Sequence, residues 1–162
     1  MPVSSPAYYR ERAYQILEKR EHSVYELYCK LVQRGCPVSV ADNLVEQLQS
    51  DGLLSDVRFG VMFVRSKLRQ GWSSKRVEFE LQKKHHISGE TWLQVLEKYS
   101  EEYPEDSFDS DIERAERIVQ RRWHSANDSE KLFRYLVNRG FSVSCAKQVL
   151  QPYRHIADLA QE

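Results

Sequence analysis

The clearest chemical signal in the chain is a run of basic side chains. Residues 57–86 carry eight Lys or Arg and only two Glu, a net charge of +6, within a chain whose formal charge is zero. Guanidinium and ammonium groups bind phosphate and carboxylate oxygens, so the run predicts an anion-binding face. The alternative is an ordinary solvated helix surface, where most basic residues lie. The cations are Arg58, Arg65, Lys67, Arg69, Lys75, Arg76, Lys83 and Lys84.

The spacing of these cations favours the anion-binding interpretation. Arg65 and Arg69 are four residues apart and share one helix face. Lys75 and Arg76 open the next predicted helix, where positive charge is mildly unfavourable with the helix dipole. The presence of Lys75 and Arg76 despite that cost indicates that they bind a group outside the helix. Trp72, just before them, either stacks on a base or a partner side chain, or fills a gap between helical units.

Three nearby features have structural explanations. Arg58 lies beside Asp56 in "LLSDVRF", and we expect the two to form a structural ion pair. Trp92 belongs to a periodic apolar group and is expected in a core. Trp123, in "RRWH", either contacts a partner together with the two arginines before it or covers the end of a core.

An acidic run follows the basic one. Residues 97–113 carry eight acids and one Lys, a net charge of -7. A run of this composition is typical of a solvated, mobile linker, which is the interpretation we favour. The alternative is an autoinhibitory segment whose carboxylates compete with DNA for the basic face. A zero total charge therefore conceals a dipolar chain.

Signatures of catalysis or cofactor binding are missing from the sequence. It contains no G-x-S-x-G, Walker loop, H-E-x-x-H or G-x-G-x-x-G. The pair His85-His86 has no Cys or His nearby at zinc-finger spacing, so no metal site is predicted. The cysteines Cys29, Cys36 and Cys145 are odd in number and are expected to be reduced, partly buried thiols. A disulfide between Cys36 and Cys145 is the alternative.

Helices must position all of these residues. Apolar residues recur at i, i+3, i+4 and i+7 along most of the 162 residues, and no alternating strand pattern of useful length occurs. The five prolines lie outside the strongly periodic segments. No apolar run reaches the length of about 18 residues that a membrane span requires, and the N-terminus has no secretory signal. The fold class is therefore predicted to be all-α.

The helical pattern repeats three times. The middle helix of each repeat is marked by four residues: an N-cap residue, two apolar residues and the residue that follows the helix. This quartet recurs at intervals of about 50 residues. The quartets are Ser23, Leu27, Leu31 and Gly35; Ser73, Val77, Leu81 and His85; and Asp128, Leu132, Leu136 and Gly140. The next helix repeats Ala41, Leu44, Val45 and Leu48 as Trp92, Val95, Leu96 and Tyr99, then as Ala146, Val149, Leu150 and Tyr153. The preceding helix repeats Ala13, Ile16 and Leu17 as Gly60, Phe63 and Val64, then as Ala115, Ile118 and Val119.

Two details of the pattern carry further expectations. Glu26 stands three residues after Ser23, which predicts a capping box. The offsets between the first two copies predict that one additional residue enters near Lys84-His85-His86, where the capping glycine is missing. The predicted architecture is three tandem three-helix repeats, at residues 6–53, 54–102 and 103–155, forming an elongated, curved body.

With these motifs in order, the chain resembles the RecX regulators of the RecA recombinase. The resemblance covers about residues 8–155 and rests on "REHSVYEL", "LVQRG", "DGLLSDVRF", "RQGWSSKRVEFEL" and "YLVNRGFS". The family shows an R-x-x-S-x-x-E-L start, a G-x-L-x-D-x-R-F junction and a G-aromatic-x-x-x-R-I turn. The chain departs from the family at His85-His86, where a glycine is usual.

The resemblance implies a cytoplasmic, non-enzymatic protein without cofactors. It implies binding in the groove of RecA–DNA filaments, which blocks filament growth and strand exchange. We expect a monomer that also binds DNA weakly, in a salt-dependent manner and without sequence preference. The expected RecA- and DNA-binding residues are Arg65, Lys67, Arg69, Trp72, Lys75, Arg76, Lys83 and Lys84. Two alternatives are a stand-alone helix-turn-helix-like DNA-binding protein and a helical adaptor for an unrelated protein.

Overall fold

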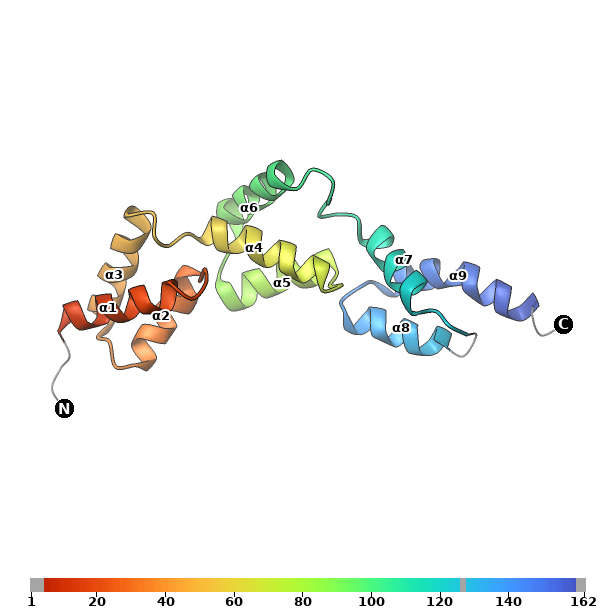
Figure 1. Ribbon diagram of the computed structural model, residues 1–162, viewed down its shortest axis with the longest axis horizontal. Helices are drawn as coiled ribbons and strands as arrows, with labels where there is room; N and C mark the ends of the chain where they lie inside the picture. Colours follow the sequence, from red (N-terminus) through yellow and green to blue (C-terminus); the bar gives the residue numbers. More distant parts are fainter. Residues whose placement is uncertain (1–4, 126–127, 160–162) are drawn as a thin grey trace. The chain divides into compact units, whose positions relative to one another are not determined.

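A computed structural model describes residues 5–125 and 128–159 of the chain. Within these residues the chain forms nine α-helices and no β-strand (Figure 1), which confirms the all-α prediction. No helix in this part of the chain is both long and apolar enough to cross a lipid bilayer. The helices are α1 (Pro6–Leu17), α2 (Val24–Gln33), α3 (Val38–Ser50), α4 (Asp56–Arg69), α5 (Ser74–His85), α6 (Gly89–Glu102), α7 (Asp111–Arg122), α8 (Asp128–Asn138) and α9 (Val143–Leu159).

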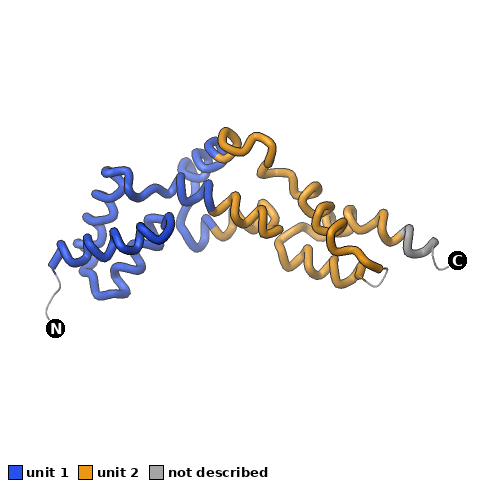
Figure 2. The backbone as a smooth tube through the Cα atoms, viewed as in Figure 1, with its two compact units in different colours: residues 1–62, 81–98 blue, residues 63–80, 99–162 orange. Residues whose placement is uncertain are grey.

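Two compact units divide the chain (Figure 2). Unit 1 comprises residues 1–62 and 81–98, and unit 2 comprises residues 63–80 and 99–162. Each unit therefore contains part of α4 and part of α5. The division into repeats at 6–53, 54–102 and 103–155, and the elongated shape, stay predictions.

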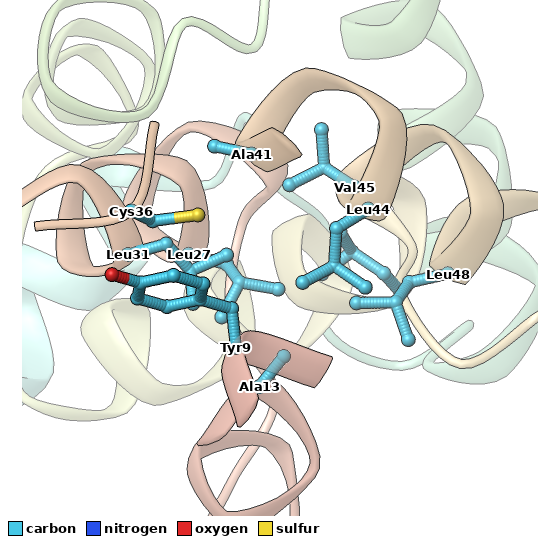
Figure 3. Packing of buried hydrophobic residues seen from close by; sticks show 10 residues of the cluster. Tyr9, Ala13, Leu27, Leu31, Cys36, Ala41, Leu44, Val45 and Leu48 are labelled. Carbon is cyan, nitrogen blue, oxygen red and sulfur yellow. The ribbon is translucent and has the colours of Figure 1, made fainter. Parts of the chain in front are cut away.

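Each unit contains one apolar cluster that the periodicity predicted. In unit 1, α1 packs on α2 and α2 on α3, and Figure 3 shows their buried side chains facing one another. Leu27, Leu31 and Ala41 are fully buried there. In unit 2, α7, α8 and α9 pack together around Leu136 and Leu150. Burying one such Leu side chain stabilises the fold by about 2 kcal/mol.

The predicted helix caps form at α2 and α5. The Ser23 hydroxyl accepts a hydrogen bond from the backbone N–H of Glu26 at 3.1 Å, and the Ser73 hydroxyl accepts one from Arg76 N–H at 3.2 Å. Gly35 has φ +85° and Gly140 has φ +92°, the left-handed conformation that ends a helix at low cost for glycine. The sequence therefore specifies where these helices begin and end.

The histidine pair at the end of α5 replaces that glycine. His86 adopts φ +57°, which is uncommon for a residue with a side chain. Ile87 N–H donates to the Leu81 carbonyl at 3.0 Å, six residues back, whereas Cys36 N–H donates to Leu31, five residues back. The additional residue predicted here is confirmed. The His86 ring stacks on Tyr25 with ring centroids 3.8 Å apart.

Three local expectations are wrong. The Glu26 carboxylate, predicted to complete a capping box, instead binds Arg20 and Lys30. Asp128, predicted as an N-cap, is the first residue of α8, and its carboxylate accepts hydrogen bonds from the N–H groups of the preceding loop. Pro152 lies inside α9, between Leu150 and Tyr153 of the third apolar quartet, and not outside the periodic segments.

The same capping device appears once in each unit. In unit 1 the Asp56 carboxylate, at the start of α4, accepts a hydrogen bond from Val24 N–H at the start of α2, at 2.8 Å. In unit 2 the Asp111 carboxylate, at the start of α7, accepts one from Ser74 N–H at the start of α5, at 2.9 Å. A carboxylate is favourable there because the first N–H groups of a helix lack partners within the helix.

A second contact accompanies each cap. The Ser23 hydroxyl lies 3.0 Å from Nδ1 of His85, at the end of α5. Ser73 N–H donates to the Arg139 carbonyl, just after α8, at 3.0 Å. Ser23 and Ser73 are both fully buried. The start of α2 therefore contacts the end of α5, and the start of α5 contacts the end of α8. The two junctions have the same construction.

The charge network beside Ser23 predicts acid sensitivity. Burial acts to raise the pKa of the Glu26 carboxyl, but hydrogen bonds from Arg20 and Lys30 outweigh it and lower the pKa to about 2. An unfolded Glu titrates near about 4.3, so the stabilisation is complete above that pH and is lost as the pH falls towards 2. Because Arg20 is half exposed, we expect a contribution of only about 1–2 kcal/mol.

Urea unfolding of the wild-type chain and of Glu26→Gln tests this expectation. The two free energies of unfolding should differ at pH 6 and converge only as the pH falls to about 2. A difference that stays constant over that range would show that the carboxylate charge is not the cause.

Candidate binding surface

The eight predicted binding residues separate into two groups by exposure. Arg69, Lys75, Lys83 and Lys84 are exposed, whereas Arg65, Lys67, Trp72 and Arg76 are half-buried. Six of the eight lie in unit 2, at the end of α4 and the start of α5. The other two, Lys83 and Lys84, lie on the last turn of α5, in unit 1.

Trp72 lies against two of the predicted cations. The Arg76 guanidinium carbon is 4.0 Å from the centroid of its ring, and the Lys67 ammonium nitrogen is 4.7 Å from it. Arg76 also donates a hydrogen bond to the Asn138 carbonyl at the end of α8. Cation–π contacts of this kind stabilise by about 0.5–2 kcal/mol. The geometry therefore supports a structural role for Trp72, which packs against Arg76, the residue that joins α5 to α8.

Arg65 is engaged by the acidic segment. Its guanidinium donates to the Tyr103 hydroxyl at 2.7 Å, and its central carbon lies 4.1 Å from the centroid of that ring. Its Nε is buried without a hydrogen-bond partner in the described structure. In this structure the Arg65 guanidinium binds Tyr103, the residue that follows α6.

The acidic segment is also held by a buried arginine. Arg114, only 4% exposed, donates to the carbonyls of Ser107 and Phe108 and forms an ion pair with Asp111 at 3.0 Å. Asp106 lies 3.8 Å from the same guanidinium. Residues 103–111 therefore make specific contacts with Arg65 and Arg114, and the mobility expected of a solvated linker stays a prediction. Sequence alone missed this role because Arg114 lies outside the basic run.

The junction "LLSDVRF" uses different partners from those expected. Arg58 forms its ion pair with Glu21, at 2.9 Å, whereas Asp56 caps α2. Burial raises the pKa of Asp56, and the hydrogen bond from Val24 N–H acts to lower it. The structural role predicted for Arg58 is confirmed. The predicted ion pair with Asp56 is wrong, because the Asp56 carboxylate accepts a hydrogen bond from the start of α2.

A basic cavity in unit 2 was not anticipated. It measures about 210 Å³ and lies where the end of α4 meets α7. Arg114, Arg117 and Arg121 lie three and four residues apart on α7 and therefore share one face. That spacing was the available signal, but acids alternate with these arginines in the linear sequence. The lining residues are Leu68, Arg69, Gly71, Asp106, Arg114, Arg117, Ile118 and Arg121.

The remaining predicted features have structural roles. Trp92 is buried, and Trp123 packs on the cluster of α7, α8 and α9 and against Tyr153, so both core assignments are confirmed. All three cysteines are free thiols, and burial raises the pKa of Cys36 and Cys145. Among the described residues no group of three or more His, Cys, Asp or Glu side chains could hold a metal ion.

Known proteins match this chain over most of its length. Models of the first and second three-helix domains of RecX match residues 10–48 and 55–96. The regulatory protein RecX of Vibrio cholerae serotype O1 (strain M66-2) is 31% identical over 88% of this chain and 91% of its own. The regulatory protein RecX of Ectopseudomonas mendocina is 27% identical over 92% of this chain and 97% of its own.

Solved structures share the fold. The crystal structure of RecX from Lactobacillus salivarius has a TM-score of 0.66 at 16% identity, covering 91% of this chain and 95% of that one. Both three-helix domain matches coincide with helices of the structure, α1–α3 and α4–α6. The chain belongs to the RecX family of regulatory proteins.

Proposed function

We propose that this chain, a RecX-family regulator of the RecA recombinase and not an enzyme, binds in the groove of RecA–DNA filaments. Binding there blocks or destabilises filament growth and strand exchange. To shift filaments in this way, the chain must bind one filament state more tightly than the others. Several contacts along one chain add to affinity because each contact after the first is intramolecular.

The exposed cations of α4 and α5 are the observation that supports this proposal. Arg69, Lys75 and Lys83 are exposed, and none forms an ion pair within the described structure. Lys84 is exposed beside Lys83. We assign these four to direct contact with RecA or DNA. The half-buried Arg65, Lys67, Trp72 and Arg76 support the exposed Arg69 and Lys75 within unit 2.

A stand-alone helix-turn-helix protein fits the residues less well. Such proteins place the last helix of a three-helix unit in the major groove and neutralise phosphates around it. However, α3 contains Asp42 and Glu46 and no Lys or Arg, and α6 contains one Lys among four Glu. A helix without cations is a poor recognition helix. We therefore expect weak, salt-dependent DNA binding without sequence preference, by a monomer.

The third group of helices, α7 to α9, has its own junction with the group before it. We propose that residues 103–155 form a third three-helix repeat after those at 6–53 and 54–102. The matching caps by Asp56 and Asp111 support this proposal, because each carboxylate begins a group and caps the group before it.

Charge reversal on α5 tests the proposed surface. RecA ATPase activity on single-stranded DNA is measured at substoichiometric ratios of this chain to RecA. Wild-type chain should reduce the activity steeply. The variant Lys75→Glu/Lys83→Glu should need about tenfold more protein, since two reversed surface charges cost of order 1.4 kcal/mol. The control is Lys19→Glu/Lys147→Glu, which reverses two exposed lysines outside α4 and α5.

The control should inhibit as the wild type does, and circular dichroism should show both variants folded. Equal inhibition by all three proteins would remove Lys75 and Lys83 from the surface. No inhibition by the wild-type chain would reject the proposed function itself.

A further inference from the structure

The cavity at the end of α4 has an uncompensated positive charge. Of its four arginines, only Arg114 is paired, with Asp106 and Asp111. Arg69, Arg117 and Arg121 are exposed and have no hydrogen-bond or ion-pair partner among the described residues. Three guanidinium groups that share one small cavity repel one another unless an anion lies between them. The cavity therefore favours an anionic ligand.

The carboxylate that borders the cavity is already occupied. Asp106 accepts a hydrogen bond from the Tyr99 hydroxyl at 2.8 Å and lies 3.8 Å from the Arg114 guanidinium. Burial and the nearby Asp106 raise the pKa of Tyr99, so its hydroxyl keeps its proton and remains a donor. Asp106 therefore does not neutralise the other arginines.

Arg114 provides an independent sign of an incomplete site. It is 4% exposed, it lines the cavity, and its Nε is buried without a hydrogen-bond partner in the described structure. A buried charged donor without a partner costs about 1–3 kcal/mol or more. A native protein retains such a group where a ligand or an ordered water completes it.

The size and chemistry of the cavity select the class of anion. A volume of about 210 Å³ is smaller than the pockets of about 300–1,000 Å³ that enclose whole drug-sized ligands. It suits a single anionic group on a larger molecule. A carboxylate has two oxygens and is saturated by one or two arginines, whereas a phosphate accepts hydrogen bonds in several directions. Leu68 and Ile118 supply apolar wall beside the charges.

We propose that this cavity binds one backbone phosphate of single-stranded DNA, through Arg69, Arg117 and Arg121. The site deepens the proposed function, because it rests on DNA being present where this chain acts. Arg114 completes the site with its unpartnered Nε, while its other nitrogens hold Asp106 and the segment around it in place. This site gives the chain a DNA contact of its own, in addition to the exposed lysines of α5.

Fluorescence anisotropy with a labelled poly(dT) oligonucleotide tests the site. Affinity is measured for the full chain and for Arg117→Gln/Arg121→Gln between about 50 and 200 mM salt. The variant should bind about tenfold more weakly at the lowest salt. Its slope of log K against log[salt] should be shallower by about 0.7, the value for one phosphate contact on a single strand. The control, Arg34→Gln/Lys147→Gln, also removes two exposed positive charges and should behave as the wild type does.

Each other outcome has a defined meaning. Unchanged affinity and slope in the variant would overturn the site, and so would a loss of RecA inhibition with DNA binding intact, which would assign the arginines to a protein contact. Competition by free nucleoside triphosphate or inorganic phosphate, without any effect of the variant on DNA binding, would also overturn it. The RecA ATPase titration is run in parallel. Its failure with wild-type chain would reject the proposed function without affecting the DNA result.

Discussion

Replacing Arg114 with Leu is expected to destabilise unit 2 by about 4 kcal/mol. Removing one partner from a buried, hydrogen-bonded charge pair costs about 3–5 kcal/mol, because the remaining groups stay desolvated without a partner. Arg114 is 4% exposed and satisfies two carbonyls and the Asp111 carboxylate. Its loss removes the donor of the Phe108 carbonyl and one donor each from the Ser107 carbonyl and the Asp111 carboxylate, and it releases the segment before α7. The measurement is urea unfolding followed by circular dichroism.

A neighbouring arginine supplies the control. Arg117 lies one turn further along α7 and is exposed, so Arg117→Leu should change the free energy of unfolding by less than about 0.5 kcal/mol. Hydrogen exchange of residues 103–111 should accelerate in Arg114→Leu and not in the control. Similar stabilities for the two variants would show that Arg114 does not organise this segment.

Replacing Gly140 with Ala is expected to cost about 3 kcal/mol. Gly140 has φ +92°, a conformation that costs a residue with a Cβ about 1–2 kcal/mol. A Cβ atom there would lie 2.6 Å from both Arg76 Cβ and Ser73 Oγ. Neither neighbour can withdraw, since Ser73 caps α5 and is fully buried. Overpacking of this kind adds about 1–3 kcal/mol.

Gly52→Ala separates the two contributions. Gly52 has φ +73°, and a Cβ there would meet nothing within 4 Å. That variant should therefore lose only the conformational part, about 1–2 kcal/mol. Equal losses in Gly140→Ala and Gly52→Ala, measured by thermal unfolding, would mean that α8 does not press against the start of α5.

Local patterns carried most of the fold. Spacings of three and four residues predicted the caps by Ser23 and Ser73, the glycine at 140 and the buried leucines. These features depend on interactions between residues that are close in the sequence. The predicted Asp56 ion pair failed because the true partner of Asp56 is distant in the sequence. Asp56 was paired with its sequence neighbour Arg58, yet it caps a helix that begins 32 residues earlier. No local pattern distinguishes these two partners for one carboxylate.

The binding surface was predicted less completely, for a related reason. Charge density along the sequence found the exposed Lys75 and Lys83, but it also selected Arg65, which is bound to Tyr103. It passed over Arg117 and Arg121, because Asp111, Glu113 and Glu116 earlier in the same helix keep the net charge of α7 low. A helix separates such charges onto different faces. The periodicity of basic residues, more than their number, would have found the α7 arginines.

The caps that Asp56 and Asp111 supply to earlier helices set the order in which those helices can complete their folding. At translation rates of about 5–20 residues per second, the ribosome delivers Asp56 roughly 2 to 6 s after Val24, whose N–H it will cap 32 positions back. The start of α2 spends that interval bound to water. Asp111 stands in the same relation to Ser74. Each newly emerged segment therefore completes the one already made, and the nascent protein matures from its N-terminus towards its C-terminus.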